Sequence, residues 1–143
     1  MVAKESLGAT GTPFTIPLEQ GKIREYATAI GSTHPEYLDA ETPVVPAHFL
    51  TTTFFWEGAT GNPWDRVEMS QQRGMHAEQE YVFHGEPPRA GTKLTATSRI
   101  DAIYEKTSRS GSTLTFVEML TEFRDPGGVL VAEAKMTAVE TGE

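Results

Sequence analysis

Polar side chains able to do acid–base chemistry gather in one segment of strand-like composition, Met75–His84. Burying a polar group without a partner costs about 1–3 kcal/mol, so His76, Glu78 and Gln79 must pair, face solvent or line a site. Residues two apart on a strand point to the same side of the sheet, which predicts that His76 and Glu78 are neighbours. This pair could serve as a general base and the carboxylate that orients it. The alternative is an interface or a solvated edge of the sheet.

Two other histidines are weaker candidates for chemistry. His34 lies in a segment that follows a predicted helix, and we interpret it as a turn residue rather than a base. His48 lies near the start of a second predicted helix, where a histidine is usually a hydrogen-bonded structural group. Contact between His48 and a ligand stays open, because backbone N–H groups at a helix N-terminus can bind a developing oxyanion.

The residue patterns that hold metals or nucleotides are missing from the sequence. The chain has 4 histidines, no cysteine and no His-Glu-x-x-His pattern, so we predict no metal site. It also has no glycine-rich phosphate-binding loop. We therefore expect no bound cofactor.

The composition is that of a globular chain and limits its partners. With 143 residues, 38% of them hydrophobic, the chain can form one domain over 1–143 with a buried core. A net charge of -8 argues against nucleic acid, which requires a basic surface. No segment has the run of about 20 apolar residues that spans a bilayer. The first ten residues lack a signal-peptide core, and the absence of cysteine suits a cytoplasmic location.

Periodicity predicts two helices followed by a meander of strands, which is an α+β pattern. Apolar residues recur at helical spacing over 19–30, and Gly31 provides a stop. Residues 1–11 are expected to be loosely ordered. The other predicted elements are a short edge strand over 12–17, an irregular stretch over 32–46, a buried helix over 47–57, and strands over 75–84, 93–105, 112–124 and 129–139.

Several motifs occur in the order found in one known family. Tyr26 and Ala27, followed by Gly31 and Pro35, match part of an active-site segment of MaoC-like enoyl-CoA hydratases. The chain resembles the FAS1-like, or MaoC-like N-terminal, dehydratase family, including the non-catalytic subunit of heterodimeric (3R)-hydroxyacyl dehydratases. The resemblance implies a hot-dog fold, in which an antiparallel sheet wraps around a central helix. Further matching motifs are Pro46-Ala47-His48-Phe49, Met75–Gln79 and Pro88–Leu94.

The two catalytic side chains of those hydratases have no counterparts here. In the family, an aspartate and a histidine five residues later activate water for addition to an enoyl thioester. Ser32 and Tyr37 occupy these positions, and no Asp or Glu stands five residues before any histidine of the chain. We interpret Ser32 as part of a local turn and Tyr37 as a packing residue, although its hydroxyl could donate to a thioester oxygen. His76 and Glu78 are the fallback catalytic candidates.

The resemblance implies a non-catalytic subunit of a two-chain (R)-specific enoyl-CoA hydratase or 3-hydroxyacyl dehydratase. Such a subunit forms part of the tunnel for an acyl-CoA or acyl-ACP thioester. Its partner is a catalytic MaoC-like subunit, or itself in a homodimer. The substrate-binding residues that follow from the resemblance are Tyr37, Pro46, Ala47, His48, Phe49, Phe54, His76 and Gln79, although aromatic residues at helical spacing more often form plain core.

Two other functions stay open. A self-sufficient homodimer would need a non-standard dehydratase site, built from His34 or from His76 and Glu78, or a thioesterase carboxylate such as Glu41 or Glu57. An acyl-binding protein without turnover would need neither. Basic residues that could meet CoA phosphates are scattered, which is typical of an ordinary surface: Arg66, Arg73, Arg89, Lys93 and Arg99.

Overall fold

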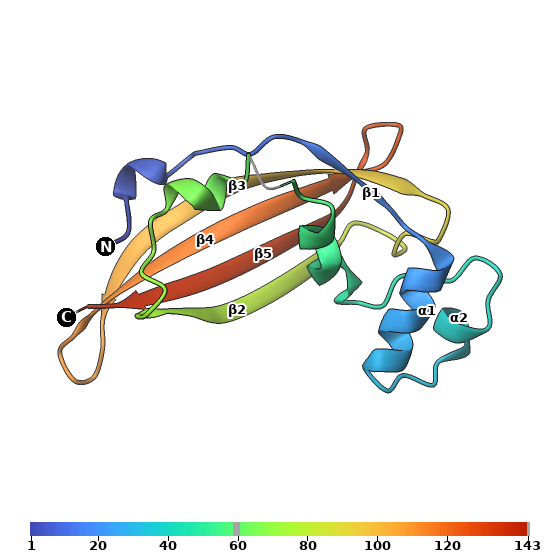
Figure 1. Cartoon of the computed structure of the whole chain (residues 1–143), viewed down its shortest axis with the longest axis horizontal. Coiled ribbons are helices and arrows are strands. Elements are labelled where there is room, and N and C mark those ends of the chain that lie inside the picture. Colours follow the sequence, from blue (N-terminus) through green and yellow to red (C-terminus); the bar gives the residue numbers. More distant parts are fainter. Residues whose placement is uncertain (59–60, 143) are drawn as a thin grey trace.

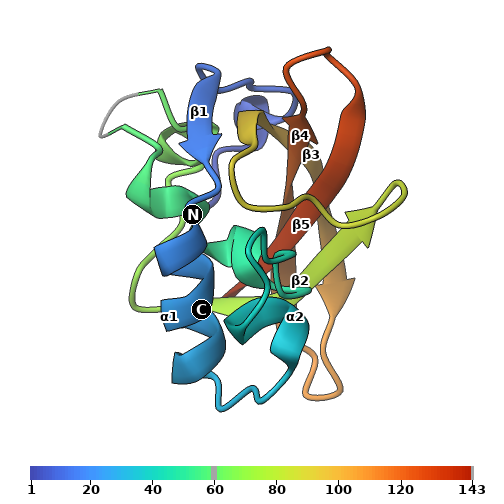
Figure 2. The same ribbon diagram turned by 90° about the vertical axis from the view of Figure 1, so that its right-hand side faces the viewer.

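The computed structural model describes residues 1–58 and 61–142 of the chain. Five antiparallel strands form one sheet in the spatial order β1-β3-β4-β5-β2, and the helical segments lie to one side of it (Figures 1 and 2). The predicted α+β class is confirmed. The strands are β1 (Phe14–Pro17), β2 (Gly74–Phe83), β3 (Lys93–Thr107), β4 (Thr113–Arg124) and β5 (Leu130–Thr141). The helical segments are α1 (Gln20–Ala29), α2 (Pro35–Leu38) and the 3-10 helices η1 (Lys4–Ser6), η2 (Phe49–Phe55) and η3 (Pro63–Arg66).

The two edges of the sheet follow from local sequence. The short strand predicted over 12–17 is confirmed as β1, which lies at one edge and pairs with β3 through Phe14 and Ala96. Pro17 cannot donate a ladder hydrogen bond, which suits an edge position. β2 forms the other edge and pairs with β5. Among the described residues, no strand pairs with the outer edge of β2.

Helix α1 ends where the sequence predicts. Gly31 has a φ of 71°, a conformation that glycine adopts without strain. Its N–H donates to the carbonyl of Thr28 (3.0 Å), and the N–H of Ser32 donates to that of Ala27 (2.9 Å). These two bonds satisfy carbonyls that the end of a helix leaves open. They also fix the direction in which the chain leaves α1.

The segment 32–46, predicted to be irregular, contains the four-residue helix α2. His34 is its N-cap, because its Nδ1 accepts the N–H of Glu36 at 3.2 Å. Pro35 takes the first helical position, where its missing N–H costs nothing. The interpretation of His34 as a turn residue is confirmed.

The helix predicted over 47–57 is shorter than expected and is the 3-10 helix η2. Thr52 donates its hydroxyl to the carbonyl of Phe49 at 2.9 Å, and Thr53 donates to that of Leu50. Such bonds compete with regular helical pairing, and adjacent β-branched residues have low helix propensity.

Burial also differs along η2. Phe49 and Leu50 are buried, whereas Phe54 is 62% and Phe55 is 67% exposed. The expectation of a helix buried all round was therefore wrong for its second half.

The first eleven residues, expected to be loosely ordered, pack against the sheet instead. The N–H of Ala3 donates to the carbonyl of Val67 (2.8 Å), and that of Gly8 donates to Ile100 (2.9 Å). Val2 is buried in a small apolar cluster that contains Val67 and Ile100. Composition alone did not show these contacts, because they join segments far apart in the sequence. In the described part of the chain, the helices are all too short or too polar to cross a bilayer.

Replacing Phe49 by Ala tests whether the start of η2 anchors the core. Phe49 is fully buried and makes an edge-on contact with Tyr26, with ring centroids 5.4 Å apart. We expect Phe49→Ala to lower the free energy of unfolding by about 3–5 kcal/mol, because a large cavity remains. The exposed Phe55→Ala variant serves as control and should change it by less than about 0.5 kcal/mol. Chemical denaturation measures both, and equal effects would contradict this assignment.

Candidate functional site

A cavity of about 510 Å³ lies between the sheet and the segments that cross it. Its roof is formed by η2, residues of η3 and the loop that leads to β2, and its floor by the four strands β2–β5. The residues that line it include Leu50, Thr51, Phe54, Glu57, Trp64, Met69, Gln71, His76, Gln79, Tyr81, Ser98, Met119, Thr121, Ala134, Met136 and Ala138. Most of the surface that these side chains present to the cavity is apolar, as is typical of pockets that bury organic ligands.

Side chains on the floor of the cavity lie in rows across the sheet, because the four strands pair in register. One row across the sheet consists of Ser98, Thr121, Ala134 and Tyr81. We call it the hydroxyl row, after its three hydroxyl-bearing members.

Two further rows follow along the strands. The second contains Met119, Met136 and Gln79, and the third contains Ala138 and His76. Rows are two residues apart, so the first and third are separated by about 13 Å. The cavity is therefore elongated along the strands and mainly apolar beyond the hydroxyl row.

Small floor residues and the short roof helix explain why the space is open. Ala134 and Ala138 fill little volume above β5. The cavity also separates two apolar clusters, one around Phe49 and one around Val67 and Ile100. Protein interiors are normally packed without voids of this size. An apolar space that divides the core is therefore a candidate binding site.

His76 and Glu78 do not form the predicted pair. The ladder between β2 and β5 pairs His76 with Ala138 and Glu78 with Thr137, which leaves Ala77 as the extra residue of a β-bulge. A bulge resets the alternation of side chains, so His76 faces the cavity and Glu78 the opposite side of the sheet. The Nε2 atom of His76 lies 3.3 Å from the Oε1 atom of Gln79 instead. No hydrogen bond joins the His76 and Glu78 side chains, both of which the structure describes.

Gln79 and Phe54, two of the predicted substrate-binding residues, also line the cavity. The Nε2 of Gln79 donates to the backbone carbonyl of Lys135 at 3.2 Å, which fixes the amide above β5. Its orientation leaves the oxygen for His76. Together they form the polar part of the cavity on the β2 side.

Glu57 is the carboxylate that the structure places on the cavity wall. Burial raises the pKa of Glu57 above its ordinary value, and the nearby charge of Asp65 raises it further. The pKa of Tyr81, across the cavity floor, is also raised by burial, while a hydrogen bond from Thr51 lowers it. The two shifts have the same first cause, which is the apolar surroundings. Glu41, the other carboxylate considered, is exposed and is not part of the cavity lining.

Ser32 and Tyr37 lie outside the cavity lining, in the α1–α2 segment. The hydroxyl of Ser32 accepts the N–H of His34 at 3.2 Å, which confirms the predicted local turn. The Tyr37 ring packs against His34, with ring centroids 5.1 Å apart. Both side chains at the hydratase positions are therefore used in local structure.

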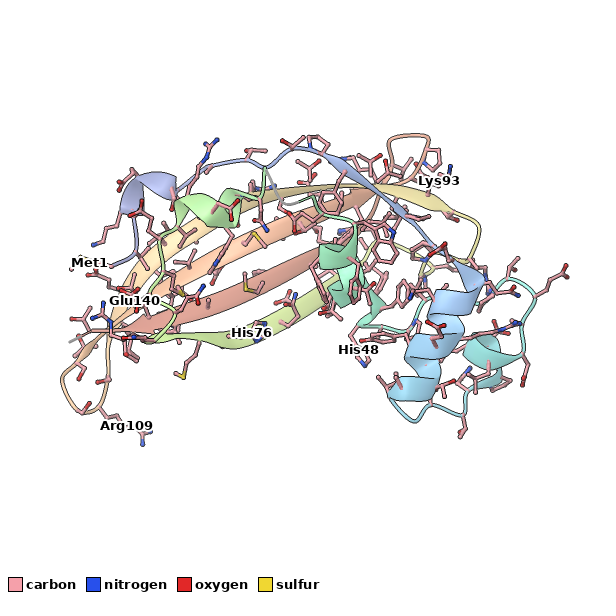
Figure 3. The ribbon with its side chains drawn as sticks, viewed as in Figure 1. Met1, His48, His76, Lys93, Arg109 and Glu140 are labelled. Atoms are coloured by element: carbon pink, nitrogen blue, oxygen red, sulfur yellow. The ribbon has the colours of Figure 1, made fainter. Side chains whose placement is uncertain are left out.

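Pro46, Ala47, His48 and Phe49 also do not line the cavity. Pro46 and Phe49 are buried, whereas Ala47 and His48 are exposed. The Tyr26 hydroxyl lies 2.6 Å from His48 Nδ1 and 3.1 Å from the His48 carbonyl oxygen, to which it donates. His48 is thus a hydrogen-bonded residue at the start of η2, apart from His76 on β2 (Figure 3).

The basic residues do not form a phosphate-binding cluster around the cavity. Arg89 forms an ion pair with Glu36 (3.2 Å), and Arg99 forms ion pairs with Asp101 (2.9 Å) and Glu122 (3.0 Å). Arg73 lies 3.6 Å from Glu140. Lys93 lies at one end of the sheet, while Arg66 is exposed on η3. Within residues 1–58 and 61–142, no group of three or more His, Cys, Asp or Glu side chains could hold a metal ion.

Sequence reasoning missed the hydroxyl row and the loop that closes one end of the cavity. Ser98 and Thr121 alternate with partly buried positions and resemble ordinary strand residues, so only the strand register brings them together. The Met69–Gln71 wall belongs to a loop without periodicity. A useful signal was available for Tyr81, which lies two residues after Gln79 on the same face of β2.

Comparisons with known proteins agree with this architecture. The model of the family described as "FAS1-like, dehydratase domain region" matches residues 5–134. A UPF0336 protein of Streptomyces coelicolor is 33% identical over 113 residues, which cover 72% of this chain and 75% of that protein.

Solved structures share the fold. The C-terminally truncated HadBC complex, a (3R)-hydroxyacyl-ACP dehydratase from Mycobacterium tuberculosis, has a chain that matches with a TM-score of 0.71 and 23% identity, covering 92% of this chain and 96% of that one. A MaoC-like dehydratase matches with a TM-score of 0.77 and 20% identity, covering 97% of this chain and 43% of the longer one. The expected hot-dog fold is confirmed. Because the family model spans most of its length, this chain belongs to the FAS1-like dehydratase family.

Proposed function

We propose that this chain is the non-catalytic subunit of a two-chain (R)-specific enoyl-CoA hydratase or 3-hydroxyacyl dehydratase. In this proposal it holds part of the acyl group of a CoA or ACP thioester, and a partner chain supplies the Asp and His. The observation that carries the proposal is the elongated apolar cavity, combined with the use of Ser32 and Tyr37 in local structure. The chain therefore has space for a substrate but lacks the acid and base of the related hydratases.

Two comparisons support a paired arrangement. The HadBC structure is a complex of a hydroxyacyl dehydratase. The MaoC-like dehydratase chain is more than twice as long as the part that this chain covers. We infer that this chain is one half of a double hot-dog unit.

The free edge of the sheet suits such an assembly. The outer edge of β2 has no strand partner within residues 1–58 and 61–142, and exposed edges favour pairing with a second chain. Met75 on that strand is 58% exposed. The rings of Phe54 and Phe55, which contact each other, are exposed to a similar degree. We infer a partner on this side of the molecule, in the cytoplasm, where the lack of cysteine is no disadvantage.

A self-sufficient hot-dog enzyme is the second candidate function, and Glu57 is the observation that favours it. Glu57 and His76 both line the cavity, which places a carboxyl group and an imidazole in the same space. A thioesterase or a non-standard dehydratase could use them as base and acid. Loss of a lone-chain activity in Glu57→Gln would support this candidate over the first.

Turnover by the two-chain complex tests the leading proposal. We expect the purified chain alone to be inactive on crotonyl-CoA and on longer enoyl-CoA substrates. Adding a catalytic MaoC-like subunit should raise the hydration rate above that of the catalytic subunit alone by about 100-fold, because the cavity positions the acyl group for the partner's acid and base. A spectrophotometric hydration assay measures both rates. Efficient turnover by the chain alone would overturn the proposal.

Filling the cavity floor tests whether the acyl group lies there. Met119→Trp should fill the cavity and lower the activity of the complex on long acyl chains by about 10- to 100-fold, because each CH₂ left unburied loses about 0.8 kcal/mol. Activity on crotonyl-CoA should change little. Leu120→Trp is the matched control, since Leu120 is the next residue of β4 and points to the opposite face. Equal effects of the two variants on long chains would contradict this location.

The raised pKa of Glu57 predicts a dependence of stability on pH. Above the ordinary carboxyl pKa of 4.5, the folded chain binds more protons at Glu57 than the unfolded chain does. The free energy of unfolding therefore falls as pH rises through the interval between the two pKa values. Glu57→Gln removes this loss, so the variant should gain stability relative to the unmodified protein as pH rises from about 4 to about 7. The exposed Glu41→Gln serves as control, and parallel stability curves for Glu57→Gln would refute the shift.

A further inference from the structure

The hydroxyl row is an unusual feature in a cavity that otherwise suits a hydrocarbon. Ser98 and Thr121 are 3% and 7% exposed, and their hydroxyl oxygens lie 2.8 Å apart. Both side chains line the cavity floor, on neighbouring strands at the same register position. Tyr81 completes the row from β2, across Ala134 of β5.

The hydrogen bonds of this row do not use all of its protons. Ser98 and Thr121 together carry two hydroxyl protons, and their mutual bond uses one of them. No second hydrogen bond to either oxygen occurs in the part of the chain that the structure describes. The row therefore has a donor left for a group inside the cavity.

A hydrocarbon tail alone would make these residues unfavourable. A buried donor that finds no acceptor loses its hydration without compensation. The next row along the strands is apolar on β4 and β5, where Met119 and Met136 lie side by side. Alanine and valine would fit the positions of Ser98 and Thr121 in size and would carry no polar group. An acceptor on the ligand explains why the row is polar.

We propose that the hydroxyl row is a subsite for an oxygen atom of the bound acyl thioester, with the free hydroxyl proton of the Ser98–Thr121 pair donated to a carbonyl or hydroxyl oxygen. This inference rests on the proposed acyl-binding function. The oxygen has two possible sources with the same chemistry: the thioester carbonyl itself, or a keto or hydroxyl group further along the acyl chain. Apolar parts of the chain would then lie over the methionine row.

Binding of three probes to the full chain tests the subsite and separates the two sources. The probes are dodecanoyl-pantetheine, its thioether analogue without the carbonyl, and a set of thioether analogues that carry one keto group moved along the chain. The variant is Ser98→Ala with Thr121→Val, which removes both hydroxyls and keeps the shape. We expect it to bind at least one oxygen-bearing probe about three- to tenfold more weakly, the effect of one lost hydrogen bond, and to bind the plain thioether unchanged.

The pattern of losses identifies the source of the oxygen. A loss with dodecanoyl-pantetheine assigns the row to the thioester carbonyl, whereas a loss with a keto thioether assigns it to an oxygen on the tail. Equal affinities of variant and unmodified protein for all probes would overturn the subsite but leave the proposed function standing. Failure of the unmodified protein to bind any probe would overturn both.

Stability measurements separate a binding role from a structural one. Replacing both partners of a buried hydrogen bond by apolar groups of similar shape is nearly neutral or stabilising, so the melting temperature of the double variant should equal or exceed that of the unmodified protein. Thr137→Val is the matched control, since Thr137 is buried on β5 but faces away from the cavity. It should leave the affinity for every probe unchanged. A loss of binding in this control, equal to that of the double variant, would contradict the subsite.

Discussion

The shortness of η2 is the constraint on which the rest of the site depends. Bonds from Thr52 and Thr53 back to preceding carbonyls hold the segment in a tight 3-10 form, and its buried residues are Phe49, Leu50 and Thr52. A longer buried helix over 47–57 would fill the space above β4 and β5. Because the helix stops at Phe55 and the floor below carries alanines, the sheet face stays open as a cavity. The same shortness leaves Phe54 and Phe55 on the surface, where a second chain could cover them.

The other end of the cavity is held by a buried charge. Glu140 on β5 is 4% exposed, accepts the N–H of Ser70 at 2.6 Å and lies 3.6 Å from Arg73. A buried carboxylate is stable only with such partners, so the loop that carries Ser70 has a fixed place. The close turn also explains Gly74, where a Cβ atom would lie 2.7 Å from the Ser70 carbonyl oxygen. Helix length thus opens the cavity at one end, and this ion-paired loop closes it at the other.

The sequence predicted the elements better than it predicted the site. Periodicity and turn residues located α1, the edge strand β1 and all four long strands, because these features depend on neighbours in the chain. Three features depended on contacts between distant segments and could not be predicted in this way. The bulge at Ala77 turned Glu78 away from His76, the register of β3 and β4 brought Ser98 to Thr121, and the sheet ordered the N-terminal residues. For η2, the hydroxyls of Thr52 and Thr53 bond to backbone carbonyls of the same segment and so compete with regular helical pairing.

The residues at the two hydratase positions, Ser32 and Tyr37, form local contacts instead of an acid–base pair. This limits what the chain can contribute to a reaction. Ser32 holds the N–H of His34, His34 caps α2, and Tyr37 packs against His34, so the segment forms one interlocked unit. A single substitution at either hydratase position would disturb this unit before it restored an acid or a base. The cavity has no such dependence on the segment, since none of these three residues lines it. In the proposed complex, this subunit binds the acyl chain away from the reacting atoms. The binding energy of such remote parts of a substrate can be used to position its reacting atoms. A chain without catalytic side chains can therefore raise the rate of a reaction, provided that its cavity fixes the tail while the partner acts on the head.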